Sequence, residues 1–230
     1  MNEFSRLELL ISNKIDDIKN KSVLVIGLGG VGGYAVENLV RSGISNIIIV
    51  DNDIIEISNL NRQIIALNSS IGEYKTTAFL KRIHDINSLC SVKTINEFID
   101  EKNIDLLFEN NIDYLVDACD TIKTKELIIK KCIEKNIKFI TCCGTGNKLN
   151  PEKMEITTLD KTEYDPIAKK LRKYVKDNHI NKKIYVVSSK EHSIVKNIST
   201  IPSISFVPAA AGILLASYVI NDILKGDNNA

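Results

Sequence analysis

The feature that most constrains the fold of this chain is a regular alternation, from Ser22 onward, of short β-branched runs and stretches with helical spacing. Parallel strands need a crossover between them, and each helical stretch can supply one. The pattern therefore predicts an α/β fold: a doubly wound, Rossmann-like and mostly parallel sheet. The expected strands span residues 22–27, 46–51, 91–95, 114–118 and 138–141, and the helices between them are expected to begin near Gly30, Gly72, Glu101 and Thr121.

The whole chain, residues 1–230, is expected to form a single domain, since 44% of its residues are hydrophobic and can fill a sizeable core. Apolar spacing over 6–19 predicts an N-terminal helical arm (1–21) before a nucleotide-binding core (22–145). The alternation then stops. A C-terminal extension, the second lobe (146–203), is expected to contain strands at 154–159 and 184–188 and a helix at 167–177. Residues 204–225 are interpreted as a return strand and an interface helix.

The start of the chain and its cysteines indicate a cytoplasmic protein. Residues 1–10 carry charge and lack the apolar region of a signal peptide. Five cysteines without a regular spacing do not suggest a disulfide-stapled secreted domain. The longest apolar run, 206–220, is interpreted as too short for a bilayer span and contains Pro208, so no stable membrane insertion is expected.

The first expected strand ends in a glycine-rich turn in which backbone N–H groups can approach a phosphate at the start of the next helix. Its glycines are Gly27, Gly29, Gly30 and Gly32. The second strand ends at Asp51, where a carboxylate can accept hydrogen bonds from ribose hydroxyls. Taken alone, these two features favour an NAD-dependent dehydrogenase.

The residues after Asp51 change that interpretation, because they bring cations to the same end of the sheet. A triphosphate calls for guanidinium and ammonium groups, which Arg62 and Lys75 can supply. At the end of a later strand, Asp120 can hold Mg²⁺ beside phosphates. ATP is therefore the better expected ligand, although each residue taken singly is also typical of an ordinary surface or helix cap.

In their order and spacing, these residues resemble the ATP-dependent adenylyltransferases related to ubiquitin-activating enzymes, which include the thiamin and molybdopterin sulfur-carrier activators. The resemblance implies roles for two groups of residues. Asp51 would contact the ribose and Asp120 would hold Mg²⁺. The phosphates would be contacted by Asn59, Arg62, Gln63 and Lys75, and Asp53 would belong to the same ATP site. The resemblance also implies a homodimer in which Arg6 reaches the neighbour's ATP, and catalytic roles for Arg6, Arg62, Lys75 and Asp120.

Within the family, the chain is most similar to the branch that dehydrates threonylcarbamoyladenosine in tRNA. The likeness continues through 144–151, 161–169 and 203–208. It implies that ATP activates the side-chain carboxylate as an acyl adenylate with release of pyrophosphate, after which ring closure expels AMP. A monovalent cation near Gly144 and a sulfur-transfer helper protein are further implied options.

Alternatives remain open at this point. Sulfur-carrier activators commonly hold zinc through two Cys-x-x-Cys pairs, and no such pair occurs among Cys90, Cys119, Cys132, Cys142 and Cys143. No zinc is expected, and with no cysteine after Cys143 a thiol nucleophile in the second lobe is excluded. Activation of the Gly-Gly end of a ubiquitin-like carrier stays the main alternative. An NAD-binding redox protein and a non-catalytic scaffold are the others.

Charge is distributed unevenly along the chain. Residues 161–196 hold ten Lys and Arg against four Asp and Glu, a surplus of +6, while the rest of the chain has 20 against 25. A basic face suits tRNA phosphates, and the expected contacts are Lys169, Lys170, Arg172 and Lys173. A solvated helix face is the competing interpretation. The histidines His84, His179 and His192 fit no metal or triad spacing and are interpreted as surface or cap residues.

Overall fold

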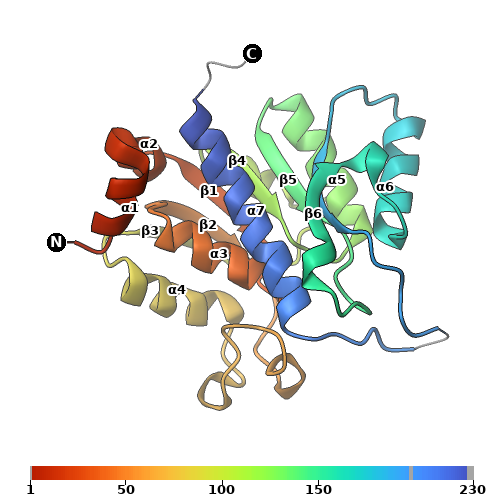
Figure 1. Cartoon of the computed structure of the whole chain (residues 1–230), viewed down its shortest axis with the longest axis horizontal. Coiled ribbons are helices and arrows are strands. Elements are labelled where there is room, and N and C mark those ends of the chain that lie inside the picture. Colours follow the sequence, from red (N-terminus) through yellow and green to blue (C-terminus); the bar gives the residue numbers. More distant parts are fainter. Residues whose placement is uncertain (1, 197–198, 227–230) are drawn as a thin grey trace.

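A computed structural model describes residues 2–196 and 199–226 of the chain. Its centre is a seven-stranded sheet in the order β3-β2-β1-β4-β5-β7-β6, in which only the β6–β7 pair is antiparallel (Figure 1). The predicted doubly wound α/β fold is confirmed. The strands are β1 Ser22–Ile26, β2 Asn46–Val50, β3 Ser91–Ile95, β4 Tyr114–Asp117, β5 Lys138–Cys142, β6 Met154–Thr158 and β7 Tyr185–Ser189.

Helices cover both faces of this sheet and build a separate apolar core on each. In β1, Val23 and Val25 face α3, α4 and α7, whereas Leu24 and Ile26 face the core that includes α5 and α6. This alternation follows from the two-residue period of a strand. The α-helices are α1 Ser5–Ile11, α2 Ile15–Lys19, α3 Gly32–Arg41, α4 Lys75–Ile86, α5 Ile122–Glu134, α6 Pro166–Asp177 and α7 Phe206–Lys225. The 3₁₀ helices are η1 Ser12–Lys14, η2 Ile57–Asn59, η3 Asn68–Ser70, η4 Ile104–Phe108, η5 Pro151–Lys153 and η6 Leu159–Lys161.

Three sequence-based expectations about single elements were wrong. The helix expected over 6–19 is interrupted at Ser12, whose φ of 56° lies in the left-handed region, so α1 and α2 are separate. The helix expected near Glu101 is only the short η4. Residues 203–205 form no strand, and α7 begins directly afterwards.

The segment expected as a second lobe extends the core sheet. β7 pairs with β5 through Thr141 with Val186 and Cys142 with Val187, and β6 adds an antiparallel edge to β7. Ala168 and Leu171 of α6 are fully buried in the same apolar core as α5. The strands and the helix predicted within 146–203 are thus present, and they continue the sheet of the nucleotide-binding core.

Helix α7 crosses the sheet face beside α3 (Figure 1). A Cβ on Gly212 would lie 2.3 Å from the carbonyl oxygen of Val31, so only glycine allows this approach. With 20 residues, α7 is long and apolar enough to span a bilayer, which corrects the length argument made from the sequence. In the fold, 44% of the apolar window is buried inside the protein.

Candidate nucleotide-binding site

A cavity of about 610 Å³ opens at the carboxyl ends of the parallel strands. The sheet order places β1 between β2 and β4, so the chain reverses its winding there, and ligands of open α/β proteins bind at such a point. Ten of the residues singled out from the sequence line it: Gly27, Gly29, Gly30, Asp51, Asp53, Asn59, Arg62, Gln63, Lys75 and Asp120. The sequence therefore located the cavity.

The glycine-rich loop contains two glycines at which neighbouring backbone atoms already occupy the place of a Cβ atom. Gly27 has a φ of 85°, and a Cβ there would lie 2.7 Å from the carbonyl oxygen of Ala118. A Cβ on Gly32 would lie 1.7 Å from the carbonyl oxygen of Gly27, so any side chain would break the turn. Helix α3 starts at Gly32 without a side-chain cap hydrogen bond, and the N–H of Gly33 donates to the carbonyl oxygen of Gly29 at 3.0 Å. The amino end of a helix placed directly after such a loop is a favourable position for an anion.

Asp51 stands at the end of β2 with a buried carboxylate that already serves the loop. Its oxygens accept hydrogen bonds from the backbone N–H of Leu28 at 2.6 Å and of Asp53 at 2.8 Å. Burial raises the pKa of Asp51, and the nearby Lys75 and the two N–H donors oppose that rise only in part. The carboxylate thus fixes the glycine-rich loop from the end of the neighbouring strand.

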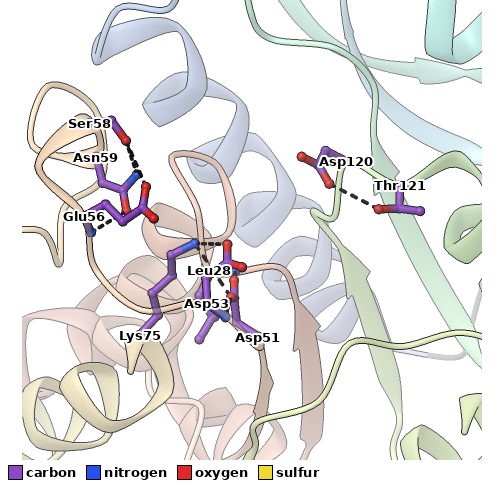
Figure 2. A network of polar contacts seen from close by, with 9 residues as sticks. All are labelled: Leu28, Asp51, Asp53, Glu56, Ser58, Asn59, Lys75, Asp120 and Thr121. Carbon is purple, nitrogen blue, oxygen red and sulfur yellow. Dashed lines mark hydrogen bonds and ion pairs between the residues drawn. The ribbon is translucent and has the colours of Figure 1, made fainter. Parts of the chain in front are cut away.

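Lys75 is buried, and carboxylates hold its ammonium group. Its Nζ lies 2.7 Å from a carboxylate oxygen of Asp53 and 3.7 Å from one of Asp51. Figure 2 shows the three side chains together. An ammonium group held between two carboxylates is pre-oriented at the cavity wall. It can exchange one of these partners for a phosphate oxygen without entering from solvent.

Arg62, Asn59 and Gln63 come from the irregular segment between β2 and α4. The guanidinium of Arg62 donates to the carbonyl oxygen of Ser58 at 2.8 Å, and in the described part of the chain it is in no ion pair. Asn59 accepts a hydrogen bond from the N–H of Glu56 at 3.1 Å, which stabilises η2. Gln63 is buried, and its Oε1 has no hydrogen-bond partner among residues 2–196 and 199–226. A buried polar atom without a partner beside the glycine-rich loop is a group that a ligand can satisfy.

Asp120 lies across the cavity from Lys75 and is exposed (Figure 2). A fully buried pair sits behind it: the Nζ of Lys125 is 3.0 Å from Asp117, which ends β4. Thr141 donates to the same Asp117 oxygen at 2.5 Å, and the other oxygen accepts from the N–H of Cys119 at 3.1 Å. Burial alone would lower the pKa of Lys125, but the Asp117 carboxylate raises it overall. The pair therefore fixes the turn that carries Asp120.

Asp120 is suited to Mg²⁺ in one particular way. Within residues 2–196 and 199–226 there is no group of three or more His, Cys, Asp or Glu side chains that could hold a metal. Mg²⁺ is usually bound by one or two carboxylates together with waters and substrate phosphates. Asp120, an exposed carboxylate in the cavity lining, fits that mode, in which it would hold the ion only together with a nucleotide.

The other residues expected at a site lie away from the cavity. Arg6 is exposed on α1, and the neighbouring arm meets the carboxyl end of α7, where Lys14 donates to the carbonyl oxygen of Leu224 at 2.6 Å. On α6, Lys169, Lys170 and Lys173 are exposed. Arg172 is partly buried and donates to the carbonyl oxygen of Thr162 at 2.8 Å, so it also braces the segment before α6.

Sequence reasoning missed several residues of the cavity. Phe98 and Ile99 line it after the end of β3, and Thr124 lies beside them, donating to the carbonyl oxygen of Ile99 at 2.8 Å. The position of this segment at a strand's carboxyl end was an available signal. The pair Asp117 and Lys125 was also missed, since a lysine in an amphipathic stretch gives no sign of complete burial.

Together, a glycine-rich loop, a ribose-side carboxylate and two cations at one edge of a doubly wound sheet define a nucleotide-binding α/β protein. Comparison with known proteins gives the family. The profile of the ThiF family matches residues 3–229, and the chain belongs to this family. The resemblance stated from the sequence is thereby confirmed.

Relatives and solved structures agree with this assignment. The tRNA threonylcarbamoyladenosine dehydratase of Bacillus subtilis is 36% identical over 98% of this chain and 96% of its own length. The dehydratase of Escherichia coli is 35% identical over 68% of this chain and 58% of its own length. The crystal structure of the E. coli enzyme TcdA with AMP has a TM-score of 0.93 and 28% identity, covering 99% of this chain and 96% of that one. The same enzyme has been solved with ATP, with a TM-score of 0.92.

Proposed function

We propose that this protein uses ATP to dehydrate threonylcarbamoyladenosine in tRNA, closing the side chain into a ring. One observation supports the proposal above all. The cavity is lined by the residues expected to bind ATP, and the chain resembles a tRNA threonylcarbamoyladenosine dehydratase over 98% of its length. ATP supplies the activation that a carboxylate needs, because its oxygen is a poor leaving group until it is bonded to phosphate.

In the proposed reaction, the substrate carboxylate attacks the α-phosphate and pyrophosphate leaves, which gives an acyl adenylate. The carbamoyl nitrogen then attacks the acyl carbon, and AMP leaves. The roles of this chain follow from its charges. Arg62 and Lys75 stabilise the charge that develops on the phosphates, Asp51 orients the ribose, and Asp120 holds Mg²⁺.

The cysteines favour this reaction over sulfur transfer. All five thiols are free, and burial raises the pKa of each, to about 12 for Cys142 and about 11 for Cys90. A thiol with a raised pKa stays protonated at neutral pH and is a weak nucleophile. Activation of a ubiquitin-like carrier without a thiol step remains the second candidate, and a sulfur-transfer helper protein remains an optional partner.

We further propose a cytoplasmic homodimer, as the family likeness implies. Large apolar side chains are exposed on α1, where Leu9 and Leu10 are 87% and 82% exposed, and on α7, where Phe206 and Ile213 are also exposed. Burial of such patches in a partner copy is favourable. Arg6, on the same helix as Leu9 and Leu10, would then face the other subunit.

Mass spectrometry of tRNA nucleosides tests the substrate. After incubation with ATP and Mg²⁺, threonylcarbamoyladenosine should lose one water, and AMP should appear in equal amount. Lys75→Ala serves as the matched control and should leave the nucleoside unchanged. If modified tRNA is untouched while a small protein ending in Gly-Gly triggers pyrophosphate release, carrier activation is the function instead.

The basic face of α6 supplies a separate test of tRNA binding. Lys169→Glu, Lys170→Glu and Lys173→Glu together should weaken tRNA binding and spare ATP binding, since none of them lines the cavity. The slope of log K against log salt should flatten by about one unit per lost phosphate contact. The control carries the same reversals at the opposite edge of the sheet, at Lys81, Lys93 and Lys102. Equal tRNA affinity and salt slope in the two triple variants would make α6 a solvated face.

A further inference from the structure

Two aromatic side chains stack on each other at the surface, from segments far apart in the sequence. The ring centroids of Tyr164 and His192 are 3.7 Å apart, with an angle of 35° between the ring planes. Tyr164 precedes α6 and is 51% exposed, and His192 follows β7 and is also exposed. A stacked pair that stays open to solvent presents an outer ring face to another planar group.

The residue beside each ring is anchored to one loop of the nucleotide cavity. Asp165, next to Tyr164, is 3% exposed, and its carboxylate accepts a hydrogen bond from the N–H of Gly144 at 2.8 Å. Glu191, next to His192, is 5% exposed and accepts from the N–H of Asn150 at 2.8 Å. Residues 144–146 line the cavity. The two segments that carry the rings are therefore bonded, through two buried carboxylates, to the two ends of the loop 144–150, whose first residues line the cavity.

The backbone at Tyr164 gives no local reason for a bulky ring there. Its φ is 55°, in the left-handed region that glycine and asparagine occupy more easily. The strained residue is kept in place by its neighbour Asp165, which also caps α6 by accepting from the N–H of Ala168 at 2.8 Å. An exposed ring on a strained, firmly anchored position is a mark of a binding surface.

Lysines flank Tyr164 in the sequence, on both sides. Lys161 precedes it, and Lys169 and Lys170 are exposed in the first turns of α6. Glu163 is the exposed acid in this stretch, and it lies near Lys190, whose pKa it helps to raise together with Glu155. An aromatic ring face beside several lysines suits single-stranded nucleic acid, which offers stacking bases and phosphates together.

We infer that Tyr164 and His192 form a stacking platform for an unpaired base of the RNA substrate, next to the nucleoside whose side chain enters the cavity. This inference rests on the proposed function, because it needs an RNA substrate. Proteins read unpaired RNA loops by stacking splayed bases on aromatic side chains. The platform would hold the RNA loop while the modified nucleoside reaches ATP. Its role is therefore to bind the RNA and to position the nucleoside.

The test uses an RNA stem-loop that carries threonylcarbamoyladenosine, with fluorescent 2-aminopurine as its neighbour. Binding to the wild-type protein should quench the 2-aminopurine, because its emission falls on stacking. Tyr164→Ala should weaken RNA binding by roughly 5- to 150-fold, the usual effect of removing one stacked aromatic ring, and should abolish the quench. Tyr164→Phe keeps the ring and should behave as wild type, whereas His192→Ala should weaken both signals.

The matched control is Tyr185→Ala. Tyr185 begins β7, is 37% exposed, and packs on Tyr218 with ring centroids 5.2 Å apart. The Tyr185→Ala variant therefore loses a similar partly exposed ring at another place on the surface. RNA binding should be unchanged in it. ATP affinity and the thermal midpoint should match wild type in Tyr164→Phe and Tyr164→Ala, which excludes a folding defect.

Two results would count against the inference in different ways. If wild type binds the RNA and Tyr164→Ala binds equally well with the same quench, the stack is only an internal contact and the proposed function stands. If the wild-type protein binds ATP but no RNA, the proposed function fails, and the platform fails with it.

Discussion

The buried pair between Lys125 and Asp117 should be worth far more to stability than any surface ion pair of this protein. Both side chains are 0% exposed, and the N–O distance is 3.0 Å. At an effective dielectric constant of about 20, two unit charges at that distance attract by about 5 to 6 kcal/mol, which desolvation largely offsets. Lys125→Met removes the attraction but leaves the carboxylate buried. Such unpaired charges cost about 3 to 5 kcal/mol.

The structure favours the lower end of this range. After the substitution, Asp117 would still accept hydrogen bonds from Thr141 and from the N–H of Cys119. We therefore expect a loss of about 3 kcal/mol in the free energy of unfolding, measured by urea denaturation. Asp117→Asn combined with Lys125→Met leaves no buried charge and should recover at least half of that loss.

The matched control lies on the same helix. Lys131 pairs with Asp105 at 2.7 Å, but the Asp105 side chain is 73% exposed, so Lys131→Met should leave the urea midpoint close to that of the wild type. Lys125→Met should also raise the Mg²⁺ concentration needed for activity, because Asp117 fixes the turn before Asp120. A loss in Lys125→Met no larger than in Lys131→Met would refute the reasoning.

Three further predictions concern the site. Arg62→Ala and Lys75→Ala should each slow adenylation roughly 30- to 1000-fold, about 2 to 4 kcal/mol of transition-state binding, in a pyrophosphate-release assay; near-normal turnover would remove the ATP-site assignment. Mixing inactive Arg6→Ala with inactive Arg62→Ala should restore activity, since a heterodimer would regain one complete site; no recovery despite proven subunit exchange would place Arg6 outside the neighbour's site. Burial tends to raise the pKa of Glu191, but the hydrogen bonds that its carboxylate accepts from the backbone N–H groups of Asn150 and Leu149 lower this pKa below the ordinary 4.5. Its stabilising effect should therefore be complete above about pH 4.5 and disappear as the pH falls through the lower, folded-state pKa. Glu191→Gln should lose about 2 kcal/mol at neutral pH and show a flatter acid-unfolding curve, and an unchanged curve would contradict this role.

The sequence predicted the central strands β1, β2 and β4 well because their burial on both faces demands nearly continuous apolar residues. It failed where tertiary contacts decide. The left-handed conformation of Ser12 splits the arm, and nothing in its amphipathic spacing reveals that break. The run before α7 was read as a strand, but no strand forms at 203–205.

The site shows the same division. Gly27 and Gly32 were found because glycines placed after a strand carry a local meaning. Lys75 was found as well, because its place after the Asp51–Gln63 stretch matched the order of residues in the family. Lys125 was missed although Asp117 is only eight residues away, since complete burial of a lysine leaves no mark in an amphipathic pattern. The contact of Tyr164 with His192 was missed because the two residues lie on separate segments that only the fold brings together.

The close packing of α7 on the glycine-rich loop has a consequence for how the protein is made. Pro208 would lie 3.3 Å from a Cβ on Gly30, and Gly212 lies against Val31, so α7 forms the back wall of the loop. During translation, α7 leaves the ribosome after every other element of the cavity. A nascent chain therefore carries the loop without its support, and nucleotide affinity should arise only when α7 has emerged and docked.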